Sequence, residues 1–96
     1  MSPVPSIPAA EAWARVQRGD ARLLDLRTEL ERRRYGWPPG AQRVALAQHV
    51  VRPGGPETIY LCQHANRSKL TGRRGASEVR DGWQGWLDAG LPVERG

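Results

Sequence analysis

Cysteine is almost absent from this chain, since Cys62 is the only one among its 96 residues. A single cysteine cannot form a disulfide within the chain, and this predicts a reducing compartment. No apolar run is long enough to span a membrane, and the first residues lack the basic and apolar regions of a signal peptide. We therefore expect a cytoplasmic protein rather than a disulfide-stabilised secreted domain or a membrane protein.

Large aliphatic residues are also scarce. Leu, Ile and Val make up 18 of the 96 residues and Phe is absent, a composition close to that of disordered chains. Eleven alanines and four tryptophans compensate, and the apolar residues fall in periodic blocks. A chain of this length holds one core of useful size. The composition predicts a single folded domain over residues 1–96, with the Pro-rich residues 1–6 as an extended or flexible entry.

Lysine occurs once, at Lys69, so the net charge of +5 comes almost wholly from arginine. Arginine bias together with many Gly, Ala and Trp residues is typical of a GC-rich genome. We interpret the run Arg32-Arg33-Arg34 as a solvated helix face, with an anionic partner there as the weaker alternative. Nucleic-acid binding is therefore not expected from the charge.

The first half of the chain alternates between helical and extended patterns. Apolar residues at helical spacing follow Pro8 and predict a helix that ends near Gly19-Asp20. The segment Leu23–Leu26 is apolar except for one carboxylate and predicts a buried strand. Thr28, with Glu31 three residues later, forms a capping-box pattern that predicts the start of a second helix.

The second half continues this alternation. We expect a short strand at Val44–Leu46, a weak helical turn at 48–51, and a strong strand at Thr58–Leu61, which is β-branched, aromatic and apolar. A helix of about two turns is expected at 68–74, and a last one around Trp83, closed by Gly90. Strands that alternate with helices indicate an α/β fold with a mostly parallel sheet flanked by helices.

Cys62 follows the strongest predicted strand, at the point where the chain turns into a loop. Backbone N–H groups of such a loop and of the helix after it would face the sulfur and favour its thiolate. A buried lone cysteine is more often a small apolar residue. The strand-loop-helix setting favours a nucleophile instead. Cys62 with His49 and His64 fits no common zinc site in spacing or number, so no metal is expected.

Four segments carry a resemblance to a known family: Leu24–Arg27, Pro39–Ala41, Cys62–Ser68 and Gly82–Val93. In this order, from about residue 7 to residue 93, the chain resembles a single-domain rhodanese. The resemblance implies a sulfurtransferase, whose cysteine takes a sulfane sulfur from a donor as a persulfide and passes it to a thiophilic acceptor. It implies a small sulfane-sulfur donor and a thiol or cyanide-type acceptor, with a donor or acceptor protein as a further partner. No cofactor, metal or membrane is required.

The resemblance also assigns roles within the loop. It makes Cys62 the nucleophile and Arg67 the cation that closes the loop. The persulfide would lie in a nest of backbone N–H groups, as such an anion needs several donors around it. The loop residues expected to bind substrate are Gln63, His64, Ala65, Asn66 and Arg67. Asp25 is expected to anchor an arginine, and we assign structural support to it and to Arg27.

Loop length separates two cysteine chemistries. Cysteine-dependent phosphatases place an arginine six residues after the cysteine, which makes room for a tetrahedral phosphate. In this chain that position is Ser68, and the arginine comes one residue earlier, at Arg67. The smaller loop suits a sulfur atom, so phosphatase activity is the lesser enzyme hypothesis.

The rival hypothesis is a non-catalytic sulfur-carrier or protein-interaction module with the same fold. Gln63 stands where the family often has a basic residue, and Ala65 where it often has a glycine. The segment 68–82 is also several residues shorter than is usual in the family. Without a cation at position 63, thiosulfate is expected to be a poor donor, because a cation beside the nucleophile would attract the dianion.

Overall fold

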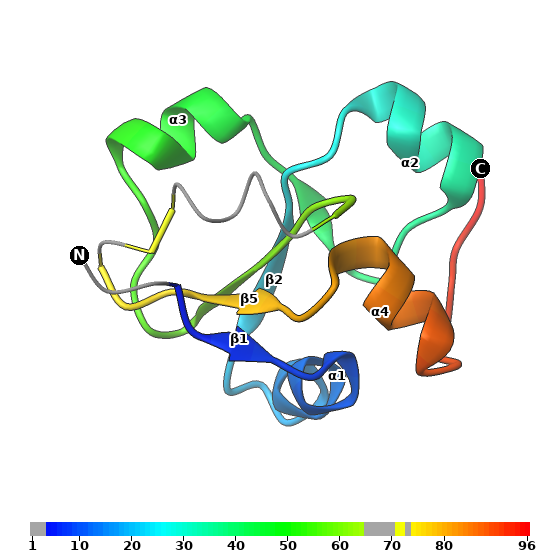
Figure 1. Ribbon diagram of the computed structural model, residues 1–96, viewed down its shortest axis with the longest axis horizontal. Coiled ribbons are helices and arrows are strands. Elements are labelled where there is room, and N and C mark those ends of the chain that lie inside the picture. Colours follow the sequence, from blue (N-terminus) through cyan, green and yellow to red (C-terminus); the bar gives the residue numbers. More distant parts are fainter. Residues whose placement is uncertain (1–3, 65–70, 73) are drawn as a thin grey trace.

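The computed structural model describes residues 4–64, 71–72 and 74–96. Within them, five strands form one parallel sheet in the order β1-β5-β4-β2-β3, so that β4 is central (Figure 1). Helices α1 and α4 cover one face, and α3 packs on the other. The mostly parallel α/β architecture expected from the sequence is confirmed. None of the described helices is long and apolar enough to cross a membrane.

The amino-terminal part supplies an edge strand and the first helix. Ser6–Ile7 forms β1, which pairs with β5, and Val4 before it is buried. The pattern predicted extended chain here but no strand. Helix α1, Ala9–Gln17, begins after Pro8, which is its N-cap rather than its first helical residue.

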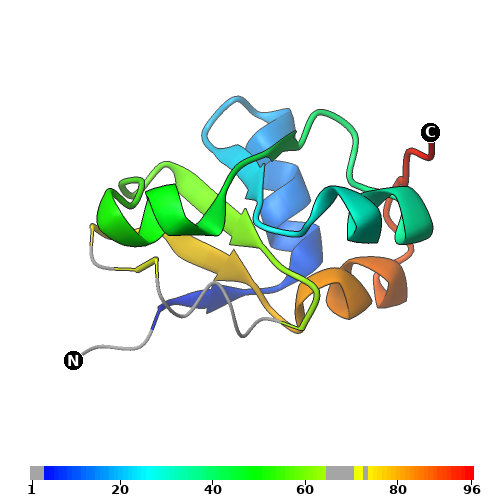
Figure 2. The same cartoon turned by 90° about the horizontal axis from the view of Figure 1, so that it is seen from above.

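Strand β2, Arg22–Asp25, begins and ends one residue earlier than predicted. Helix α2, Glu29–Tyr35, begins with the predicted capping box: the Thr28 side chain accepts from the backbone N–H of Glu31, and the Glu31 carboxylate accepts from the backbone N–H of Thr28. The capping box fixes where α2 leaves the carboxyl end of β2, at the same end of the molecule as α4 (Figure 2).

The predicted strand at Val44–Leu46 is wrong by two residues. Strand β3 is Gln42–Arg43, an exposed edge pair of polar residues, and helix α3, Leu46–Val51, begins where the strand was expected to end. The apolar side chains of Val44 and Leu46 pack against a buried cluster under the sheet. Their pattern therefore marks packing after the strand and not the strand itself.

Strand β4 is Thr58–Leu61, as predicted, and all four of its residues are buried. Strand β5, Ser77–Val79, was not predicted, because its buried Ser and Glu do not form an apolar pattern. The predicted helix at 68–74 lies mostly outside the described residues, and its described part, Thr71, Gly72 and Arg74, is not helical. Helix α4, Gly82–Asp88, agrees with the prediction of a last helix closed before Gly90.

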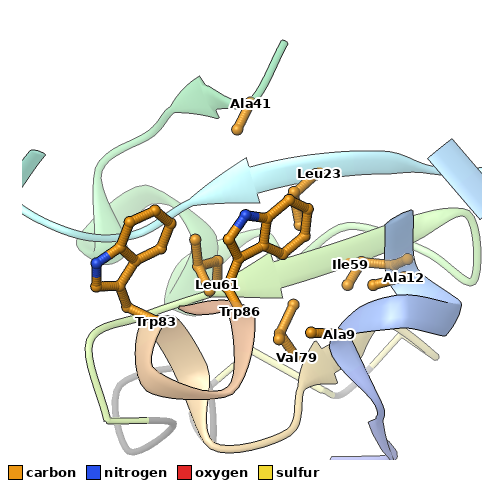
Figure 3. Packing of buried hydrophobic residues seen from close by; sticks show 9 residues of the cluster. All are labelled: Ala9, Ala12, Leu23, Ala41, Ile59, Leu61, Val79, Trp83 and Trp86. Carbon is orange, nitrogen blue, oxygen red and sulfur yellow. The ribbon is translucent and has the colours of Figure 1, made fainter. Parts of the chain in front are cut away.

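Two apolar clusters pack against opposite faces of the sheet, as alternate side chains of a strand must. Figure 3 shows the main core, in which Trp83 and Trp86 from α4 supply the volume that the scarce aliphatic residues do not. The indole N–H of Trp86 donates to the carbonyl of Pro92 at 2.8 Å, which ties the end of the chain to this core. The main core comprises Ala9, Ala12, Leu23, Ala41, Ile59, Leu61, Val79, Trp83 and Trp86. The second core comprises Leu24, Leu26, Tyr60, Cys62 and Ala76.

Candidate active site

Cys62 directly follows the central strand β4 and is 1% exposed. Tyr60 and Cys62 belong to the second core, whereas Leu61 between them belongs to the main core, so the strand alternation continues through the cysteine. The carbonyl of Cys62 accepts from the backbone N–H of Trp83 in the first turn of α4, at 2.9 Å. Pairing of β4 with both β2 and β5 therefore holds the cysteine at the carboxyl edge of the sheet.

The predicted loop is described only at its beginning. Gln63 is half-buried and His64 is exposed. Ala65, Asn66 and Arg67 lie outside the described residues, so their roles in binding substrate and closing the loop stay predictions.

Asp25 and Arg27 form an ion pair in which both side chains are 0% exposed. The guanidinium donates through Nε to Asp25 Oδ1 at 3.0 Å and through Nη2 to Oδ2 at 2.9 Å. The backbone N–H of Arg27 also donates to Oδ1, at 3.0 Å. This fork geometry satisfies a buried charge, which would otherwise be costly.

The remaining contacts of Arg27 connect this pair to the cysteine loop. Its Nη2 donates to the carbonyl of Gly36 at 2.7 Å, and its Nη1 lies 3.5 Å from Oε1 of Gln63. Its Cζ also lies 4.3 Å from the ring centroid of Trp83, a cation–π contact. Arg27 thus contacts the residue after Cys62 and the indole of the residue whose N–H binds the Cys62 carbonyl.

Arg32 is a functional neighbour that the sequence interpretation missed. It was assigned to a solvated face, but it is 15% exposed and its Nε lies 3.2 Å from Asp25 Oδ2. Its Nη2 donates to the carbonyl of Ala41 at 2.9 Å, and its Cζ lies 5.0 Å from the Trp37 ring. The buried carboxylate in the middle of the Leu23–Leu26 pattern was the one signal that cations must face it. It did not identify which arginines.

His49 braces the second core from α3. Its Nδ1 lies 2.5 Å from the hydroxyl of Tyr60, and that hydroxyl also accepts from the backbone N–H of Gly54 at 2.8 Å. Tyr60 therefore donates its proton to a neutral imidazole. Burial, and secondly the charge of Arg22, lower the pKa of His49 below its usual value, which favours the same neutral form. Within the described residues, no three His, Cys, Asp or Glu side chains gather as metal ligands.

Solved structures with this architecture give the fold a name. A rhodanese-related protein from Thermoplasma volcanium is 20% identical, with 96% of this chain and 99% of that chain covered, at a TM-score of 0.78. The human single-domain sulfurtransferase TSTD1 is 22% identical, with 92% and 97% covered, at a TM-score of 0.66. The chain has the rhodanese fold. No protein-family model matches the sequence, and no curated protein matches it either.

The rhodanese fold is shared by proteins of different chemistry. A Rhodopseudomonas palustris protein of unknown function, a possible tyrosine phosphatase, is 23% identical, with 95% of this chain and 85% of that chain covered, at a TM-score of 0.76. The fold alone therefore does not choose between sulfur and phosphate transfer. In this chain the choice rests on the residues around Cys62.

Proposed function

We propose that this rhodanese-fold chain is a sulfurtransferase that carries a sulfane sulfur on Cys62 as a persulfide. The supporting observation is the position of the only cysteine, at the carboxyl end of the central strand of the sheet. Ligands of open α/β sheets bind beyond this edge. The spacing from Cys62 to Arg67 supports sulfur over phosphate, because it makes the smaller loop.

The reaction has two displacement steps. The Cys62 thiolate attacks the outer sulfur of the donor, and the donor's S–S bond breaks so that sulfite, a sulfinate or a thiolate leaves with the electron pair. The outer sulfur of the resulting persulfide is then attacked by a thiol or cyanide acceptor, and Cys62 departs again as the thiolate. No external oxidant or reductant is consumed, because the sulfane sulfur moves without its two electrons.

The surrounding residues have supporting roles in this proposal. Backbone N–H groups of residues 63–67 hold the persulfide anion, and Arg67 shapes the loop and adds positive potential. Asp25 and Arg27 keep the base of the loop rigid through the contact of Arg27 with Gln63. A thiol that must stay reduced between turnovers suits the cytoplasm, which we infer as its compartment.

A non-catalytic carrier module is the second candidate, favoured by one observation. The half-buried Gln63 brings an uncharged amide to the start of the loop, so that no cation next to the cysteine recruits thiosulfate. Such a module would accept sulfur from a partner protein but would not turn over small donors.

Steady-state transfer from a sulfane donor to a thiol acceptor, followed as sulfide release, separates the two candidates. We expect turnover in the wild type and none in Cys62→Ser, which removes the nucleophile and keeps the fold, as circular dichroism should verify. Substantial turnover by Cys62→Ser would refute the mechanism. A wild type that forms the persulfide without turnover would favour the carrier.

A further inference from the structure

A shallow pocket of about 280 Å³ lies beside the start of the cysteine loop. One wall is the side of α2 that carries residues four apart, and the other is the chain directly after Cys62. Figures 1 and 2 show this chain segment running toward the end of the molecule where α2 and α4 lie. The lining residues are Leu30, Glu31, Arg34, Tyr35, Gln63 and His64.

The α2 wall keeps apolar surface open beside a charge. Leu30 is 70% exposed and Tyr35 is 42% exposed, two of the four large apolar side chains that the described residues leave in solvent. Arg34 lies with its Cζ 5.9 Å from the Tyr35 ring, and no carboxylate within the described residues forms a salt bridge with it. The Glu31 carboxylate is directed to Thr28 by the capping box. The wall therefore presents an apolar patch with one available cation.

The opposite wall contributes hydrogen-bonding groups without a fixed charge. Oε1 of Gln63 faces Arg27 Nη1 at 3.5 Å, so its amide N–H groups are left for other acceptors. A small dianion would gain little from such a pocket, because most of its lining is apolar or neutral. A carbon-bearing monoanion would cover Leu30 and Tyr35 and place an acidic group against Arg34.

We propose that this pocket selects organic sulfane donors, in which the transferable sulfur is attached to an apolar group with a carboxylate at its far end. This inference rests on the proposed function, because the outer sulfur must reach Cys62. Leu30 and Tyr35 hold the apolar body, and Arg34 binds the distant carboxylate. The thiolate takes the outer sulfur, the S–S bond breaks, and the organic group leaves as a thiolate or sulfinate with the electron pair.

Three thiosulfonates separate the contributions: methanethiosulfonate, benzenethiosulfonate and 4-carboxybenzenethiosulfonate. All three lose a sulfinate, and they differ in the apolar body and the distant carboxylate. We expect kcat/KM to rise along the series by about tenfold for the ring and about fivefold for the carboxylate. Equal use of the three donors would overturn the inference and leave the sulfurtransferase proposal intact.

Matched variants locate the effect. Arg34→Gln should remove the carboxylate gain and leave methanethiosulfonate unchanged, whereas Arg33→Gln, beside it but outside the pocket, should keep the gain. Leu30→Ala should reduce the ring gain, whereas Val51→Ala, equally exposed on α3, should not. Equal effects of the two arginine variants would mean that only the general charge of the surface acts.

A binding measurement keeps the inference testable if sulfur transfer fails. Titration of Cys62→Ser with 4-carboxybenzenesulfinate, followed by NMR shifts of the α2 and Gln63 amides, needs no chemistry at the cysteine. Binding that Arg34→Gln weakens about fivefold supports the pocket. No shifts at α2 would overturn it, whatever the outcome of the transfer assay.

Discussion

Removing the carboxylate of Asp25 should cost far more stability than removing a carboxylate from the surface. Asp25 accepts from Nε, Nη2 and the backbone N–H of Arg27, and both side chains are fully buried. In Asp25→Ala the Arg27 guanidinium keeps the Gly36 carbonyl and the Trp83 ring but has no carboxylate. A buried charge that loses its partner costs about 3–5 kcal/mol, a large share of the 5–15 kcal/mol of a typical domain.

A double-mutant cycle separates the pair from its surroundings. Arg27→Met should cost less than Asp25→Ala, because Arg32 still faces the aspartate at 3.2 Å. The double variant should lie close to Asp25→Ala rather than at the sum of the two, since no buried charge is left unpaired. Urea unfolding followed by tryptophan fluorescence measures all three.

The control is Asp20→Ala, which breaks an exposed pair with Arg18 of the same 2.9 Å length. It should cost less than about 1 kcal/mol. The reasoning is refuted if Asp25→Ala costs no more than this control, or if the two buried substitutions are additive.

Three further expectations concern pH, donor choice and packing. Because the pKa of His49 is lowered in the fold, the unfolded chain takes up the proton first. The contribution of His49 should therefore be complete above about pH 6.5 and be lost as pH falls below it. His49→Gln should flatten the resulting fall in urea midpoint, and His64→Gln should leave it. Gln63→Arg should raise kcat/KM for thiosulfate about tenfold, or 1.4 kcal/mol, and the gain should shrink in high salt; unchanged thiosulfate use would mean that Gln63 does not face the donor. Gly85→Ala should lower Tm, by about 2 kcal/mol of stability, because its Cβ would lie 2.1 Å from the Arg80 carbonyl oxygen; an unchanged Tm would contradict that packing.

The parts of the fold that the sequence predicted depend on local chemistry. A central parallel strand is buried on both faces, so Thr58–Leu61 forms a continuous apolar run with unambiguous ends. The capping box from Thr28 to Glu31 fixed the start of α2 for a similarly local reason. Together these two features located Cys62 and the helix that lines the neighbouring pocket.

The parts that the sequence did not predict depend on tertiary contacts. Strands β1, β3 and β5 have two or three residues each and exist because a neighbour pairs with them. Burial of Arg32 is equally non-local, since only the fold brings it to Asp25 and Trp37. Three consecutive arginines carry no pattern that distinguishes the buried one from the exposed ones.

The most direct test of the central claim is the intact mass of the protein after exposure to a sulfane donor and removal of the excess. The wild type should gain about 32 Da, one sulfur atom, and lose it again when a thiol or cyanide acceptor is added. Because Cys62 is the only cysteine, Cys62→Ser should gain nothing. A wild type that gains no mass, or an adduct that Cys62→Ser also carries, would contradict the account.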